Sequence, residues 1–85
     1  MSLPEVRAMD VKGADGITYS VSSLLSADLR SVTEVVVFAP CGSQYDFGTD
    51  AAAAILAAEK GADALAEYSE YSIIVPASRA RIVAL

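Results

Sequence analysis

The fold is decided by one stretch of the sequence, 34-EVVVFAPCGSQYDFGTDAAAAILAAEKGADALAEYSEY-71. It opens with an unbroken apolar run, Val35–Ala39, and continues through a loop rich in Gly, Ser and Asp into a long alanine-rich segment. A second apolar run, Ile73–Val75, follows. This order is typical of a strand, a crossover helix and a parallel strand, and such a pair needs cover on both faces of its sheet. We therefore expect the central strand, Glu34–Ala39, to be buried on both sides.

A single helix is predicted from about Asp50 to Tyr68, because Thr49 or Asp50 can cap its first free amides. Its core-facing stripe follows the three-and-four spacing of an amphipathic helix and consists of Ala51, Ile55, Ala58, Ala62 and Leu65. A second side carries almost no side-chain bulk; its residues are Ala53, Ala57, Gly61 and Ala64. These small residues either reflect high helix propensity alone or permit close approach by another helix. Gly61 favours the second interpretation, since glycine inside a helix costs about 1 kcal/mol relative to alanine.

The segment before this stretch predicts a β-hairpin. Two strand-like runs, Val6–Val11 and Ile17–Val21, flank Lys12–Gly16, which contains an Asp-Gly pair typical of hairpin loops. We expect a short helix, Ser22–Arg30, after the second strand. The alternative is that residues 17–31 form a helix only, with no second strand.

After the long helix, the sequence predicts two more strands, Tyr71–Val75 and Arg79–Leu85, separated by a turn. The apolar residues of the last strand indicate that it is docked in the sheet or against a neighbouring chain, although Arg79 and Arg81 are equally typical of a guarded edge strand. The expected fold is a single domain, residues 1–85, of the α/β class, with α+β as the other possibility. It has one sheet of four or five strands, one long alanine-rich crossover helix and one short helix.

Composition excludes several classes of function. The 85-residue chain is 54% hydrophobic and has a formal net charge of -5, which argues against disorder and against nucleic acid as a partner. No apolar stretch approaches the roughly 20 residues of a membrane span, and no secretory signal is visible. The single cysteine, Cys41, cannot form an internal disulfide, so we expect a cytoplasmic protein. Histidine is absent, which excludes histidine-based triads and most zinc sites; we expect no cofactor and no metal.

The loop after the central strand is where open α/β sheets place ligands. Its weak candidate ligand-binding residues are Cys41, Gly42, Ser43, Gly48, Thr49 and Asp50. A Cys41 thiolate would lack an activating base, and we expect the nearby acids Asp46 and Asp50 to oppose its formation. No catalytic residue is therefore assigned.

Tyr45 and Phe47 in the same loop are predicted interface residues, because aromatic side chains are enriched at the centres of interfaces. The alternative is that one of them covers the core from beneath the loop. The full predicted interface comprises Tyr45, Phe47, Ala53, Ala57, Gly61 and Ala64. The sequence thus favours a small acidic, non-catalytic assembly or protein-binding protein, either a homo-oligomer or a subunit or inhibitor of a protein partner. The alternative is a small ligand-binding or thiol-dependent enzyme module that uses the loop from Cys41 to Asp50.

Overall fold

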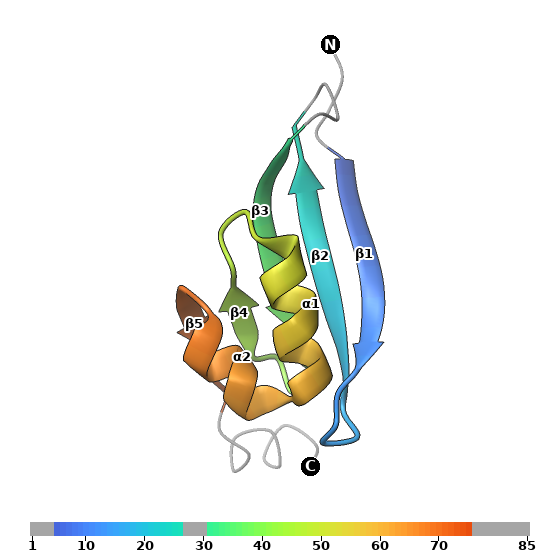
Figure 1. The fold of residues 1–85 in the computed structure, drawn as a ribbon, viewed down its shortest axis with the longest axis vertical. Coiled ribbons are helices and arrows are strands. Elements are labelled where there is room, and N and C mark those ends of the chain that lie inside the picture. Colours follow the sequence, from blue (N-terminus) through green and yellow to red (C-terminus); the bar gives the residue numbers. More distant parts are fainter. Residues whose placement is uncertain (1–4, 27–30, 76–85) are drawn as a thin grey trace.

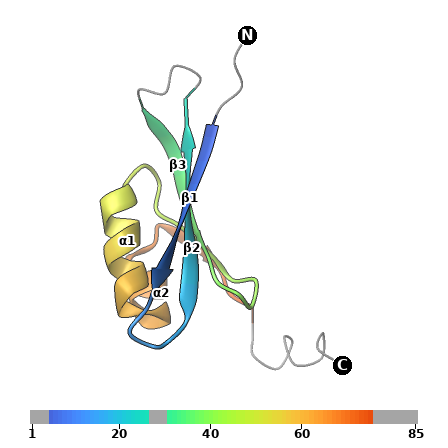
Figure 2. The ribbon, with the colours of Figure 1, turned by 90° about the vertical axis from the view of Figure 1, so that its right-hand side faces the viewer.

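The structure, a computed structural model, describes residues 5–26 and 31–75. These residues form a five-stranded antiparallel sheet with two helices on one face (Figures 1 and 2). The strands are β1 (Glu5–Lys12), β2 (Thr18–Leu25), β3 (Val32–Phe38), β4 (Gln44–Asp46) and β5 (Tyr71–Ile73), and the helices are α1 (Ala51–Lys60) and α2 (Ala62–Tyr68). The predicted mixed α/β class with a single sheet is confirmed, in its α+β form, because an antiparallel sheet carries its helices on one side.

The predicted hairpin is confirmed. β1 and β2 pair antiparallel, and in their loop the Gly13 amide donates to the Ile17 carbonyl at 2.8 Å. The predicted helix Ser22–Arg30 is wrong for Ser22–Leu25, which continue β2, while residues 27–30 lie outside the described part. β2 bonds to β1 on one edge and β3 on the other, and this pairing outweighs the local helical pattern.

The predicted parallel strand unit is wrong. β3 turns back through Pro40–Gly42 into β4, and the two strands pair antiparallel. Two backbone hydrogen bonds within the turn join Ala39 with Ser43 and Gly42 with Ala39. The strand that leads into α1 is therefore β4, and β5 returns beside it, also antiparallel. The predicted strand Tyr71–Val75 ends earlier, at Ile73, and the predicted strand Arg79–Leu85 lies outside the described residues.

The expectation that both faces of β3 are buried is also wrong. Val35 and Val37 are fully buried against the helices, whereas Val36 is half-buried and Phe38 is 39% exposed. A run of β-branched residues without polar alternation had suggested burial on both sides. In the described structure the helices cover one side alone (Figure 2).

The helical layer is built mainly from small residues. Ala54, Ala57, Ala58 and Leu65 are buried in the core that α1 and α2 share with the sheet. The Asp50 carboxylate accepts a hydrogen bond from the Ala53 amide at 3.0 Å, so of the two predicted caps, Thr49 and Asp50, the structure uses Asp50. The predicted single helix is divided at Gly61, whose φ of 116° is outside the helical range.

Candidate functional site

One face of the sheet carries no described helix (Figure 2), and we call it the open face. The strand register places four rows of residues on it, because paired residues in neighbouring strands point to the same side. The rows are Val6, Leu24 and Glu34; Ala8, Ser22, Val36, Asp46 and Tyr71; Asp10, Ser20, Phe38, Gln44 and Ile73; and Lys12 and Thr18. The open face therefore combines aliphatic, aromatic and acidic side chains with one lysine, which lies at its edge next to the β1–β2 loop.

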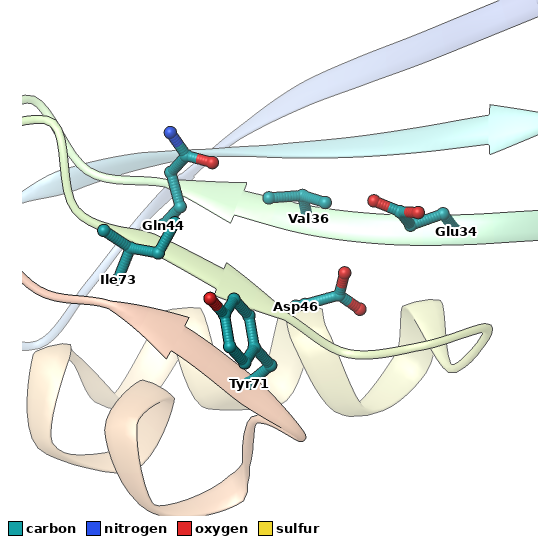
Figure 3. Close-up of a pocket in the computed structure, with 6 residues that line it drawn as sticks. All are labelled: Glu34, Val36, Gln44, Asp46, Tyr71 and Ile73. Atoms are coloured by element: carbon teal, nitrogen blue, oxygen red, sulfur yellow. The ribbon is translucent and has the colours of Figure 1, made fainter.

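Two adjoining hollows lie on the open face. The acidic hollow, of about 200 Å³, lies over β3, β4 and β5 (Figure 3) and is lined by Glu34, Val36, Gln44, Asp46, Tyr71 and Ile73. The apolar hollow, of about 230 Å³, lies over β1, β2 and β3 and is lined by Val6, Ser22, Leu24, Glu34, Val36 and Phe38. Glu34 and Val36 line both, so the two hollows form one continuous surface.

The acidic hollow presents two carboxylates from neighbouring strands. Figure 3 shows Glu34 of β3 and Asp46 of β4 on the same side of the sheet as Tyr71. The Asp46 carboxylate accepts a hydrogen bond from the Gly48 amide at 2.7 Å, which holds it in place. The six lining residues include two acids and no base, so this hollow carries negative charge.

The predicted interface aromatics lie elsewhere. Tyr45 and Phe47 are each only 4% exposed and belong to the core of the chain itself. Their positions agree with the alternative prediction, in which an aromatic residue of this segment covers the core. The alternation of polar and aromatic residues from Gln44 to Phe47 is the period-two signal of a strand, and it could have located β4.

The predicted small-residue strip is closely approached by the chain's own β1–β2 loop. A Cβ atom added at Gly61 would lie 2.8 Å from an Asp15 carboxylate oxygen. In the described structure, the space beside Gly61 is therefore occupied by the Asp15 carboxylate and not by a second helix. Beside the strip is a hollow of about 310 Å³, which we call the helix groove; it is lined by Ala53, Leu56, Ala57, Lys60 and Tyr68. Ala53 and Ala64 are half-buried and Ala57 is buried.

The predicted ligand-binding loop is divided by β4. Cys41, Gly42 and Ser43 lie in or beside the β3–β4 turn, whereas Gly48, Thr49 and Asp50 precede α1 at the opposite end of β4 (Figure 1). The structure therefore does not bring the two halves together as one site.

Cys41 is exposed, and its Sγ atom lies 3.3 Å from the Ser43 hydroxyl. Hydrogen bonds from the Ser43 hydroxyl and the Ser43 amide lower the pKa of Cys41. Asp46 and Asp50, which were expected to oppose the thiolate, are not among the causes of this shift.

A separate hollow of about 220 Å³ adjoins Cys41, and its lining includes Tyr19 and Tyr45. Burial raises the pKa of both phenols, and the hydrogen bond to Asp15 raises that of Tyr19 further. Both phenols therefore stay protonated near neutral pH, and neither can take the proton of the thiol.

Within residues 5–26 and 31–75, no group of three Cys, Asp or Glu side chains is placed to hold a metal ion. Neither of the described helices has the length and apolar character needed to cross a membrane. No protein-family model, curated protein or solved structure matches the chain.

Proposed function

We propose that this chain is a small acidic, non-catalytic assembly protein whose open face binds another polypeptide, with a second copy of the chain as the partner. The observation that carries the proposal is the unequal cover of the sheet. Val35 and Val37 are sealed by the helices, while large apolar side chains on the other face stay exposed: Val6, Phe38, Tyr71 and Ile73.

Apolar exposure on this face has a physical cost. A solvated face of an antiparallel sheet is normally polar, and contiguous apolar patches commonly mark binding sites. Burial of apolar surface contributes roughly 25 cal/mol per Å². A partner that covers Phe38 and Ile73 would therefore be bound with a favourable free energy from the apolar surface removed from water. Two such faces can stack about 10 Å apart, as in sheet sandwiches.

The alternative function, a ligand-binding or thiol-dependent enzyme module, has weaker support. The lowered pKa of Cys41 and the adjoining hollow favour it. However, the residues lining that hollow provide no proton acceptor, and the other half of the predicted loop lies beyond β4. A cytoplasmic location remains part of the proposal, since an unpaired exposed thiol suits a reducing compartment.

The proposal is tested by sedimentation velocity of the purified chain over a wide concentration range. We expect an oligomer that the substitution Phe38→Asp converts to a folded monomer, because the new carboxylate would have to be buried at the contact. Retention of the fold is checked by circular dichroism, and Phe38 is exposed enough to tolerate the change.

The matched control is Leu56→Asp, which places the same carboxylate in the helix groove on the other side of the molecule. It should leave the oligomer intact. A natural chain that stays monomeric at about 1 mM, or an oligomer broken by Leu56→Asp and unaffected by Phe38→Asp, would contradict assembly through the open face.

A further inference from the structure

We propose that residues 76–85 of the same chain bind its open face in the isolated molecule and compete there with a second copy. The inference rests on the proposed function, because it assigns to that binding face a regulator within the chain. Residues 76–85 lie outside the described part of the structure, and their sequence is 76-PASRARIVAL-85.

The first argument is charge. The acidic hollow contains Glu34 and Asp46 and no basic lining residue. Residues 76–85 contain no acid and two of the six basic residues of the chain, Arg79 and Arg81. Arginine is well suited to such a site, since its planar guanidinium can donate two parallel hydrogen bonds to one carboxylate.

The second argument is the order of residue types. Val75, the last described residue, is tied to the β3–β4 turn by its amide, which donates to the Ser43 hydroxyl at 2.9 Å. The acidic hollow, over β3 to β5, is nearer to this exit than the apolar hollow, over β1 to β3. In residues 76–85 the arginines likewise come first and the aliphatic residues after them. Asp46 pairs with Tyr71, and Glu34 lies one row further from this exit. An extended segment that runs diagonally back over β4 and β3 towards β1 therefore meets acids with its arginines and apolar side chains with its aliphatic end.

The third argument is reach. Neighbouring strands lie about 4.8 Å apart, so the sheet of five strands is roughly 20 Å across. Ten extended residues span up to about 33 Å, which covers this width and leaves length for a diagonal path. In an extended segment, alternate side chains share one side, which groups Arg79 and Arg81 with Val83 and Leu85. Attachment to the same molecule also gives the segment an effective concentration in the millimolar range.

The test places a single fluorescent reporter in the full chain. The sequence has no tryptophan, so the substitution Leu85→Trp introduces one indole on the side of the segment that carries the arginines. At protein concentrations below those that give oligomers, we expect blue-shifted emission and protection from acrylamide quenching. Both signals should be independent of protein concentration, because the contact is intramolecular.

A charge reversal in the same reporter chain locates the contact. Glu34→Lys should make the indole at least about threefold more accessible to quencher, and the added substitution Arg81→Glu should restore protection by exchanging the two charges. Glu67→Lys is the matched control, because it makes the same change at an exposed position of α2, away from the open face. It should have no effect.

Three results would overturn the inference. They are an indole that is fully accessible at low concentration, protection that develops only as concentration rises, and protection that Glu34→Lys leaves unchanged. The proposed function fails separately. A protected indole in a chain that never self-associates would support the intramolecular contact and contradict assembly. An accessible indole in a chain whose oligomer is broken by Phe38→Asp would support assembly and contradict the intramolecular contact.

Discussion

The carboxylate of Asp15 joins three parts of the chain. One of its oxygens accepts hydrogen bonds from the Tyr19 hydroxyl at 2.6 Å and from the Ala62 amide at 3.1 Å, and the other accepts from the Ile17 amide at 3.1 Å. The Tyr19 bond is the largest cause that lowers the pKa of Asp15, followed by the bond from Ile17. One side chain thus fixes the β1–β2 loop and meets the start of α2.

This arrangement predicts a pH-dependent effect of Asp15→Asn. At pH 7 the variant should have a lower urea midpoint than the natural chain, because hydrogen bonds to a charged acceptor are lost. The folded pKa of Asp15 lies below its unfolded value, so its contribution is fully present above about pH 4 and is lost as pH falls through the folded pKa. The difference between the two midpoints should therefore narrow at about pH 3.

Urea unfolding followed by circular dichroism at both pH values measures this difference. Asp10→Asn, the same exchange at an exposed position of β1, is the control and should change the midpoint little at either pH. A difference that widens in acid would contradict the role given to Asp15.

Among the secondary-structure elements, the two helices meet at Gly61. The residue has a positive φ of 116°, and a Cβ atom there would also approach the Asp15 carboxylate. Backbone conformation and local crowding therefore both require glycine at this break.

Gly61→Ala should lower the free energy of unfolding by about 3 kcal/mol, since backbone strain and a steric clash add together. Gly16→Ala is the matched control: its φ is 83°, and a Cβ atom there would have no neighbour within 4 Å. Strain alone predicts a loss of about 1 kcal/mol for the control. Equal losses in chemical denaturation would show that the contact with Asp15 has no energetic effect.

Local signals in the sequence predicted some elements and missed others. The β1–β2 hairpin and the Asp50 cap depend on residues close together in sequence, and both could be predicted. The break at Gly61 could not, because it depends on Asp15, whose contact with Ala62 spans 47 positions. The pairing of β3 with β4 was missed because the apolar run of β3 resembles a parallel strand, while β4 has only three residues.

The candidate site was predicted less well than the fold. The open face combines residues from five strands, and a sequence without the correct register cannot show that Glu34 and Asp46 share a hollow. Tyr45 and Phe47 were chosen for their aromatic character, yet the pleat of β4 directs Tyr45 inward, opposite Val37. The sequence did allow the inference that the sheet has more apolar side chains than the rest of the chain can cover.

For the whole molecule, the net charge sets how copies respond to salt. Each chain carries a formal charge of -5, so copies that approach one another repel, while the apolar contact attracts. Salt weakens repulsion between exposed charges and leaves apolar contact largely intact. It should also weaken the pairing of Arg79 and Arg81 with the acidic hollow, which frees the open face.

Self-association should therefore strengthen as sodium chloride is raised from about 50 mM to about 500 mM. Sedimentation velocity measures the change in association constant, and the Phe38→Asp chain should show no comparable increase. Dissociation of the natural chain at high salt would indicate that copies are joined by ion pairs and not by apolar contact.

The alanine layer of α1 has a consequence for how this protein can vary. Ala54 and Ala58 are completely inaccessible to solvent, and a larger side chain at either position would force the helix away from the strands. Beneath α1, evolutionary change is thus confined to residues of nearly the same size. On the open face no such limit on side-chain size applies, so substitutions there change what the face can bind while the architecture stays constant.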